Sequence, residues 1–192
     1  MLNSDARTRV LDAAEHLFSE RGYASVKLKD IAEAVGIRHA TLYHHVPGGK
    51  EALYLEVTER TLLRHRQGLD DIMQKHDGDL RAQLFGIADW LLSHPPMDFI
   101  RMVKSDMIEL DPSKTMYLSQ LALDSMIEPI ARALYAAQAR GEVEHTDLGL
   151  VAGGLFGMFE SLHLIPEGVF QKSRSEMIGQ LLDAFLYGIV KR

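Results

Sequence analysis

The sequence contains no cysteine, which excludes disulfide bonds, thiolate metal sites and a cysteine nucleophile. This absence is compatible with a reducing compartment, and we expect a cytoplasmic protein. Long hydrophobic runs are also missing, because the longest, Leu148 to Phe159, spans only 12 residues and is too short to cross a membrane. The N-terminal segment is polar and lacks the apolar core of a signal peptide.

Sequence motifs of common enzymes are absent as well. The chain has no nucleophile elbow, no phosphate-binding Walker loop and no dinucleotide fingerprint. Its nine histidines include no pair spaced by four residues beside a carboxylate, so we expect no metal site, no cofactor and no catalysis. The acidic cluster of Asp106, Glu109 and Asp111 is interpreted as a solvated helix end in preference to a general acid–base pair.

Charge is distributed unevenly along the chain. The net charge is -6, which by itself argues against nucleic-acid binding. Residues 1–50, however, carry seven Lys or Arg against six Asp or Glu, for a local charge of about +1, whereas residues 51–192 are acidic. An acidic body with a neutral-to-basic head remains compatible with DNA binding.

Helical periodicity dominates the sequence, and no strand-like alternation of any length occurs. We therefore predict an all-α protein of about nine helices. Pro129 should kink the helix that contains it or mark a new first turn. Expected helices cover residues 5–21, two short segments within 28–46, and then 50–76, 80–93, 97–109, 114–140, 148–165 and 173–190.

Two short apolar-periodic segments, separated by a turn at Gly36, lie between Leu28 and Val46. Ile31 and Val35 give the first segment an apolar face, and Leu42 and Val46 do the same for the second. Glycine suits the turn because it adopts a left-handed backbone at little cost. This spacing is typical of a helix-turn-helix, whose second helix lies in a DNA major groove.

The first 55 residues resemble the TetR family of bacterial transcriptional regulators, through the segments VLDAAEHLFSERGY, DIAEAVGI, TLYHHV and GGKEAL. The resemblance implies a helix-turn-helix DNA-binding domain at 1–50 and a helical ligand-binding and dimerisation domain at 51–192. It further implies a homodimer that binds double-stranded operator DNA, most simply as a repressor released by a small-molecule effector. The alternatives are a helical enzyme and an interaction module without sequence-specific DNA binding.

The resemblance also identifies candidate DNA-binding residues. Matches to the family's phosphate-contacting positions are Thr41, Tyr43, His45 and Lys50, whose side chains can all donate to phosphate oxygens. Base contacts would fall to Arg38, His39, Ala40 and His44.

Two cations stand where the family usually has a hydroxyl residue at a helix start. They are Lys27, before the first helix of the motif, and Arg38, before the second, so both helices lack a side-chain oxygen cap. The two cations suit phosphate or base contact instead. For Arg7 and Arg9, near the start of the first helix, a solvated face is favoured over phosphate contact.

Large or adaptable side chains of the body are most simply core residues, and they would also line any ligand cavity. Glu160 and His163, three residues apart on an apolar helix, are the candidate polar groups of such a pocket. The full candidate set is Trp90, Met102, Met107, Tyr117, Met126, Phe156, Phe159, Glu160 and His163.

Small residues recur every fourth position at Gly149, Gly153, Gly157 and Ser161, with Ala184 and Gly188 in the last helix. Each helical glycine costs about 1 kcal/mol, so close helix packing must compensate. Packing within one chain and a two-fold interface between two chains both fit this pattern, and we favour the two-fold interface.

Overall fold

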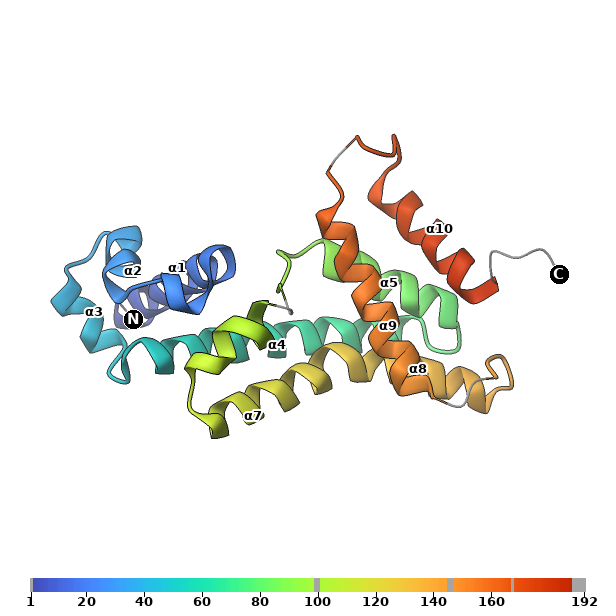
Figure 1. Cartoon of the computed structure of the whole chain (residues 1–192), viewed down its shortest axis with the longest axis horizontal. Helices are drawn as coiled ribbons and strands as arrows, with labels where there is room; N and C mark the ends of the chain where they lie inside the picture. The colour runs from blue at the N-terminus through green and yellow to red at the C-terminus, as the bar shows by residue number, and fades with distance from the viewer. Residues whose placement is uncertain (1, 99–100, 145–146, 167, 188–192) are drawn as a thin grey trace. The chain divides into compact units, whose positions relative to one another are not determined.

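The computed structural model describes residues 2–98, 101–144, 147–166 and 168–187 (Figure 1). These residues form nine α-helices and no strand, which confirms the all-α prediction. The helices are α1 (Leu2–Ser25), α2 (Leu28–Val35), α3 (His39–His45), α4 (Gly49–Lys75), α5 (Leu80–Leu92), α7 (Pro112–Ala122), α8 (Glu128–Ala139), α9 (Leu148–Ser161) and α10 (Arg174–Tyr187).

Two predicted helices are interrupted. The segment expected over 97–109 contains a π-helical stretch, Met102–Asp106, followed by a 3₁₀ turn, Met107–Glu109. The helix expected over 114–140 is divided into α7, a π-helical stretch at Leu123–Ile127, and α8. Pro129 lies in the first turn of α8, where its missing N–H would have had no helical partner. It therefore marks a new helix start, one of the two outcomes predicted for it.

The chain divides into two compact units, and α4 contributes to both. Unit 1 contains the residues up to Leu63 together with Met97–Leu121, and unit 2 contains Arg64–Pro96 and the residues from Ala122 onward. Unit 1 thus joins the helix-turn-helix to a segment that begins about 50 residues further along the chain, at Met97. The functional division at residue 50 remains a prediction.

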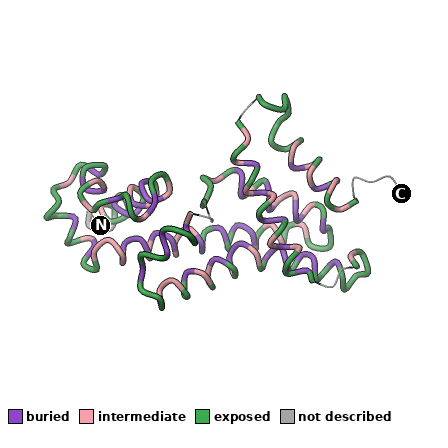
Figure 2. Tube along the Cα trace, in the orientation of Figure 1, coloured by how far each residue is buried: buried purple, intermediate pink, exposed green. Residues whose placement is uncertain are grey.

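Helices α1, α2 and α3 pack around an apolar core in unit 1 (Figure 2). Val10, Ile31 and Leu42 are each fully buried in it. Gly36 ends α2 with φ 75°, and the N–H of Ile37 donates to the carbonyl of Ala32 at 3.0 Å. This is the left-handed C-terminal cap that the sequence predicted at Gly36.

Unit 2 is built from α5, α8, α9 and α10 with the second part of α4. Asp147 caps α9 by accepting a 2.9 Å hydrogen bond from the N–H of Leu150. Ser173 opens α10 and exchanges hydrogen bonds with Glu176, as in a capping box. Fully buried side chains of this unit include Leu84, Ile87, Met126, Ile130, Leu155, Ile178 and Leu182.

In the part of the chain that the structure describes, no helix has the length and apolar character needed to cross a membrane.

Candidate nucleic-acid interface

Helix α3 presents opposite faces to the core and to solvent. Leu42 is fully buried and Val46, directly after the helix, is 5% exposed, so these two residues hold the helix on unit 1. The remaining side chains are left outward because a helix advances about 100° per residue. Exposed positions are Arg38, His39, Ala40, Thr41, Tyr43 and His44, and His45 is half-buried. The structure therefore gathers the predicted recognition residues on one free surface.

Neither cation at a helix start supplies a side-chain cap. Arg38 is the N-cap residue of α3, with extended backbone (φ -68°, ψ 142°), and its side chain makes no capping hydrogen bond. Lys27 occupies the same position before α2 and is exposed. In α2 the carboxylate of Asp30 accepts a 2.8 Å hydrogen bond from the Lys27 N–H, which reinforces this helix start. Both cationic side chains thus remain available for contact outside the helix cap.

The two arginines near the start of α1 make contacts within unit 1. Arg9 donates a 2.8 Å hydrogen bond to the carbonyl of Val35 at the end of α2. Arg7 lies 2.7 Å from the carboxylate of Glu56 on α4, although both side chains remain substantially exposed. Arg9 therefore has a structural role that the sequence pattern did not predict.

Lys50, in the first turn of α4, lies against the segment that follows α1's bend. Its Nζ is 4.1 Å from the centroid of the Tyr23 ring and donates a long, 3.4 Å hydrogen bond to the carbonyl of Ala24. Partial burial lowers the pKa of the Lys50 ammonium, although nearby carboxylates counteract this shift. A cation over an aromatic face is held electrostatically by the ring quadrupole. The sequence had assigned no role to Tyr23.

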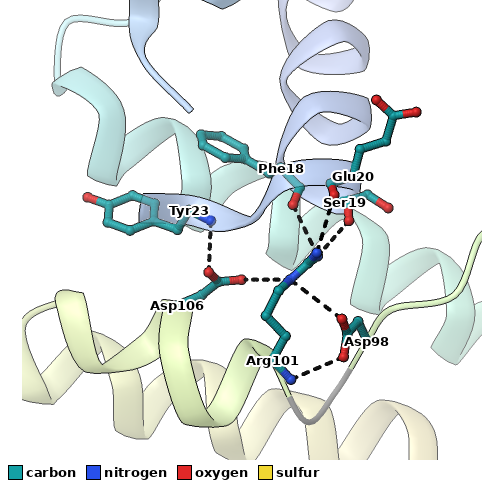
Figure 3. A network of polar contacts seen from close by, with 7 residues as sticks. All are labelled: Phe18, Ser19, Glu20, Tyr23, Asp98, Arg101 and Asp106. Carbon is teal, nitrogen blue, oxygen red and sulfur yellow. Dashed lines mark hydrogen bonds and ion pairs between the residues drawn. The ribbon is translucent and has the colours of Figure 1, made fainter. Parts of the chain in front are cut away.

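Arg101 closes the C-terminal end of the regular part of α1 (Figure 3). Its guanidinium donates to the carbonyls of Ser19 at 2.5 Å, Phe18 at 3.3 Å and Glu20 at 3.5 Å. These carbonyls precede the bend at Gly22 and carry the partial negative charge of a helix end, so a cation there is favourable.

Asp106 anchors the bend at the end of α1. Its carboxylate accepts a 2.8 Å hydrogen bond from the Tyr23 N–H and lies 3.7 Å from Arg101 Nε (Figure 3). Asp106 is only 4% exposed, and this burial raises the pKa of the carboxyl group. The prediction of a solvated acidic cluster is therefore wrong for Asp106, although Glu109 and Asp111 are exposed. The error arose because Tyr23, whose N–H donates to this carboxylate, is 83 residues away in sequence.

The predicted ligand-pocket residues are divided between the units. Met102, Met107 and Tyr117 belong to unit 1, and the others belong to unit 2. Both methionines are buried, whereas Tyr117 is half-exposed and its hydroxyl donates to Glu59 at 2.7 Å. The buried members of unit 2 are Met126, Phe156 and Phe159.

Of the polar pocket candidates in unit 2, Trp90 has a hydrogen-bond partner for its ring nitrogen, whereas His163 Nε2 has none. Trp90 Nε1 donates to His65 Nδ1 at 3.2 Å. His163 Nε2 lies 4.0 Å from the Glu160 carboxylate and makes no hydrogen bond, although the side chain is only 7% exposed. Burial lowers the pKa of His163, and nearby Arg174 lowers it further. A surface hollow of ≈ 250 Å³ follows α9, lined by other residues that include Ile165, Phe170, Arg174 and Met177.

The small-residue stripe of α9 faces outward. Gly149, Gly157 and Ser161 are exposed, Gly153 and Ala184 are half-buried, and Gly188 lies outside the described residues. Apart from its chain neighbours and the adjacent backbone of α9, a Cβ atom at Gly153 or Gly157 would meet no atom of the described residues within 4 Å. Packing against another helix of the same chain therefore does not account for these two glycines within the described residues.

The part of the chain that carries this surface is similar to known transcriptional regulators. Residues 10–57 match the family model described as "Bacterial regulatory proteins, tetR family". This segment contains α2, α3, Tyr23 and Lys50. Among curated proteins, the chain is similar to the HTH-type transcriptional regulator UidR of Escherichia coli K12, with 28% identity over 93% of each chain.

Solved structures share the fold across nearly the whole length. A putative transcriptional regulator from Saccharomonospora viridis, solved in complex with choline, matches with a TM-score of 0.74 and 25% identity, covering 98% of this chain and 100% of that one. AibR, solved in complex with isovaleryl coenzyme A and operator DNA, matches with a TM-score of 0.73 and 17% identity, covering 95% and 98%.

Proposed function

Because this chain belongs to the TetR family of bacterial transcriptional regulators, we propose that it acts as a homodimeric repressor of a palindromic operator. Release from the operator follows when a small molecule binds the helical body. The observation that carries this proposal is the orientation of α3: Leu42 is fully buried, while Arg38, Thr41 and Tyr43 lie on its free surface.

In the proposed complex, α3 lies in the major groove, where an α-helix fits. Arg38 donates two hydrogen bonds to a guanine, and Ala40 contacts a thymine methyl group. His39 and His44 read neighbouring base edges. Backbone phosphates are contacted by Lys27, Thr41, Tyr43, His45 and Lys50, which set the register of the helix on the duplex.

The homodimer is proposed to form through the stripe of α9 that contains Gly153 and Gly157, together with α10. Open space over both glycines allows close approach of a second backbone. Apolar side chains on the same two helices are also solvent-exposed in the single chain, with Leu150 72% and Phe185 41% exposed. A two-fold axis uses this surface twice, and it places two copies of α3 on half-sites roughly one or more DNA turns (~34 Å) apart.

The effector is proposed to be a small molecule bound mainly by apolar contacts in the body. Glu160 and His163, whose side chain is 7% exposed and whose Nε2 lacks a hydrogen bond, are the candidate polar contacts. Proteins of this fold have been solved with choline and with isovaleryl coenzyme A, so the fold accommodates chemically different small molecules. An effector releases DNA only if it binds the two conformational states with different affinities.

Selection of bound duplexes from a random pool tests the DNA-binding part of this proposal. We expect a palindrome to be enriched, and its affinity to fall about 10³-fold or more between 50 and 200 mM salt if six or more phosphates are contacted. Arg38→Ala should cost about 1–3 kcal/mol and relax selectivity at one position of each half-site.

Arg66→Ala is the matched control, because Arg66 is also an exposed arginine but lies on α4 in unit 2, outside the helix-turn-helix. It should leave both the affinity and the selected sequence unchanged. Enrichment of sequences without any palindrome would refute the proposal.

A further inference from the structure

We propose that Asp106 and Arg101 are positioning residues for DNA binding, which hold the Gly22–Ala24 bend so that it orients the Lys50 ammonium toward a DNA phosphate. The inference rests on the proposed function, because Lys50 must contact DNA. All of these residues belong to unit 1. They lie on three segments: the end of α1, the start of α4, and the π-helical stretch Met102–Asp106 with Arg101 directly before it.

The first step is the attachment of the bend to Asp106. The Tyr23 N–H donates to the Asp106 carboxylate at 2.8 Å, and this carboxylate is almost completely buried. Gly22 has φ 76°, and a Cβ atom at this position would lie 3.0 Å from Asp106 Oδ1. A side chain is therefore excluded both by the backbone conformation and by the closeness of the carboxylate.

The second step is the neutralisation of this buried carboxylate by Arg101. The guanidinium lies 3.7 Å from Asp106 and donates to the carbonyl oxygens at the end of the regular part of α1. One cation thus meets two sources of negative charge, the carboxylate and the helix terminus. Both contacts attach the same bend to the same segment of the chain, so the position of the bend depends on this pair (Figure 3).

The third step leads from the bend to Lys50. The Tyr23 ring packs against Tyr54, with ring centroids 4.9 Å apart, and against Phe18 at 6.1 Å. The Lys50 ammonium lies over this fixed ring and near the Ala24 carbonyl. An ammonium has three donors, so at least one remains for a phosphate while the others keep these contacts.

Restraining Lys50 in this way strengthens DNA binding because a lysine side chain otherwise loses much rotamer freedom when it meets a phosphate. The bend that contains Tyr23 and Ala24 removes part of that loss before DNA arrives. Asp106 and Arg101 act one contact further away, through the backbone of Tyr23 and the end of α1. Neither is proposed to touch DNA.

A double-mutant cycle between Asp106→Ala and Lys50→Ala tests the inference, with affinity for a mixed-sequence 30-base-pair duplex measured at several salt concentrations. Lys50→Ala should reduce the slope of log affinity against log salt by about one. Asp106→Ala should weaken binding in the wild-type background and lower the same slope. In the Lys50→Ala background it should change affinity by less than about two-fold, because its effect passes through Lys50.

Asp106→Asn is the conservative variant, since its amide oxygen can still accept from the Tyr23 N–H, and it should retain wild-type affinity within about two-fold. Asp98→Asn is the matched control: Asp98 also lies 3.7 Å from Arg101 Nε but does not contact Tyr23, and it should be neutral. Hydrogen exchange at the Tyr23 amide should accelerate in Asp106→Ala alone. If that variant does not fold, Arg101→Met replaces it in the cycle, with the same expectation.

Equal losses from Asp106→Ala with and without Lys50, or tighter binding by Asp106→Ala, would overturn the inference while leaving the proposed function intact. Failure of the wild-type protein to bind any duplex at low salt would instead refute the proposed function, and the inference with it.

Discussion

The guanidinium of Arg9 donates a 2.8 Å hydrogen bond to the carbonyl oxygen of Val35, the last residue of α2. A cation at this position meets both an unpaired carbonyl and the negative end of the helix. The contact ties the beginning of α1 to the first helix of the helix-turn-helix. It therefore supports the platform on which α3 is held.

Arg9→Met should lower the free energy of unfolding by about 1–2 kcal/mol, because it removes a charge-assisted hydrogen bond while keeping a long, unbranched side chain. Urea unfolding followed by circular dichroism measures this change. Arg7→Met is the control, since Arg7 forms an exposed ion pair with Glu56, and its cost should stay below about 1 kcal/mol. Equal losses of unfolding free energy in the two variants would show that the Val35 contact stabilises the fold no more than an exposed ion pair does.

Leu42→Ala and Tyr43→Ala, at adjacent positions of α3, should affect different properties: the first should lower stability, and the second should lower DNA affinity. Leu42 is fully buried, so truncation should cost about 2–5 kcal/mol of stability. Tyr43 is 49% exposed, and its loss should change stability by about 0.5 kcal/mol or less while weakening DNA affinity. Thermal unfolding and duplex binding, measured on both variants, check the contrast. A stability loss confined to Tyr43→Ala would contradict the orientation of α3.

Gly68→Ala should destabilise unit 2 by about 1–3 kcal/mol, because the new Cβ atom would lie 2.1 Å from the ring of Trp90. Gly179→Ala on α10 is the matched control, since its nearest neighbour would be the Arg81 side chain at 3.9 Å. That change should be neutral or stabilising by up to about 1 kcal/mol, because alanine favours the helix. Urea denaturation of both variants provides the comparison, and an unaltered midpoint for Gly68→Ala would contradict the packing of Trp90.

Gly157→Leu should leave the folded monomer intact and weaken the proposed dimer, because open space surrounds Gly157 in the single chain. Sedimentation velocity over a range of concentrations should show dissociation at concentrations at least about tenfold higher than for the wild type, or about 1.4 kcal/mol of lost association energy. Ala136→Leu, at an exposed small residue of α8, is the control and should not change the association. An unchanged dimer in Gly157→Leu would exclude this part of the stripe from the interface.

Acidification should destabilise the folded chain through His163, whose pKa is lowered mainly by burial and further by Arg174. The folded state then binds fewer protons than the unfolded state between the two pKa values, so stability rises with pH in that window. The loss of stability is absent above the unfolded-state pKa of about 6.5, and it becomes complete below the folded-state pKa of His163.

His163→Gln removes this titration, and the difference in unfolding free energy between pH 7.5 and pH 5.5 should be smaller for the variant than for the wild type. Urea titrations at the two pH values measure it. His16→Gln serves as the control, because His16 carries a side chain that is 70% exposed. A His163→Gln variant with the full wild-type pH dependence would contradict the predicted contribution.

The local sequence pattern was sufficient to predict the helix-turn-helix. The apolar spacing of Ile31, Val35 and Leu42, and the glycine at position 36, depend only on helical periodicity and on backbone freedom, which neighbouring residues determine. The exposed face of α3 follows from the same periodicity, so its residues could be named in advance. The identity of the family also lies in short segments of the first 55 residues, which is where the family model matches.

Tertiary structure alone decided the roles of Asp106, Arg101 and Tyr23. Their contacts join positions about 80 residues apart, and no periodicity specifies which distant segment a buried carboxylate will meet. The sequence pattern placed Asp106 in water because it was interpreted, with Glu109 and Asp111, as part of a solvated helix end. Burial and charge pairing depend on what packs from outside the local segment, and only the folded chain supplies that.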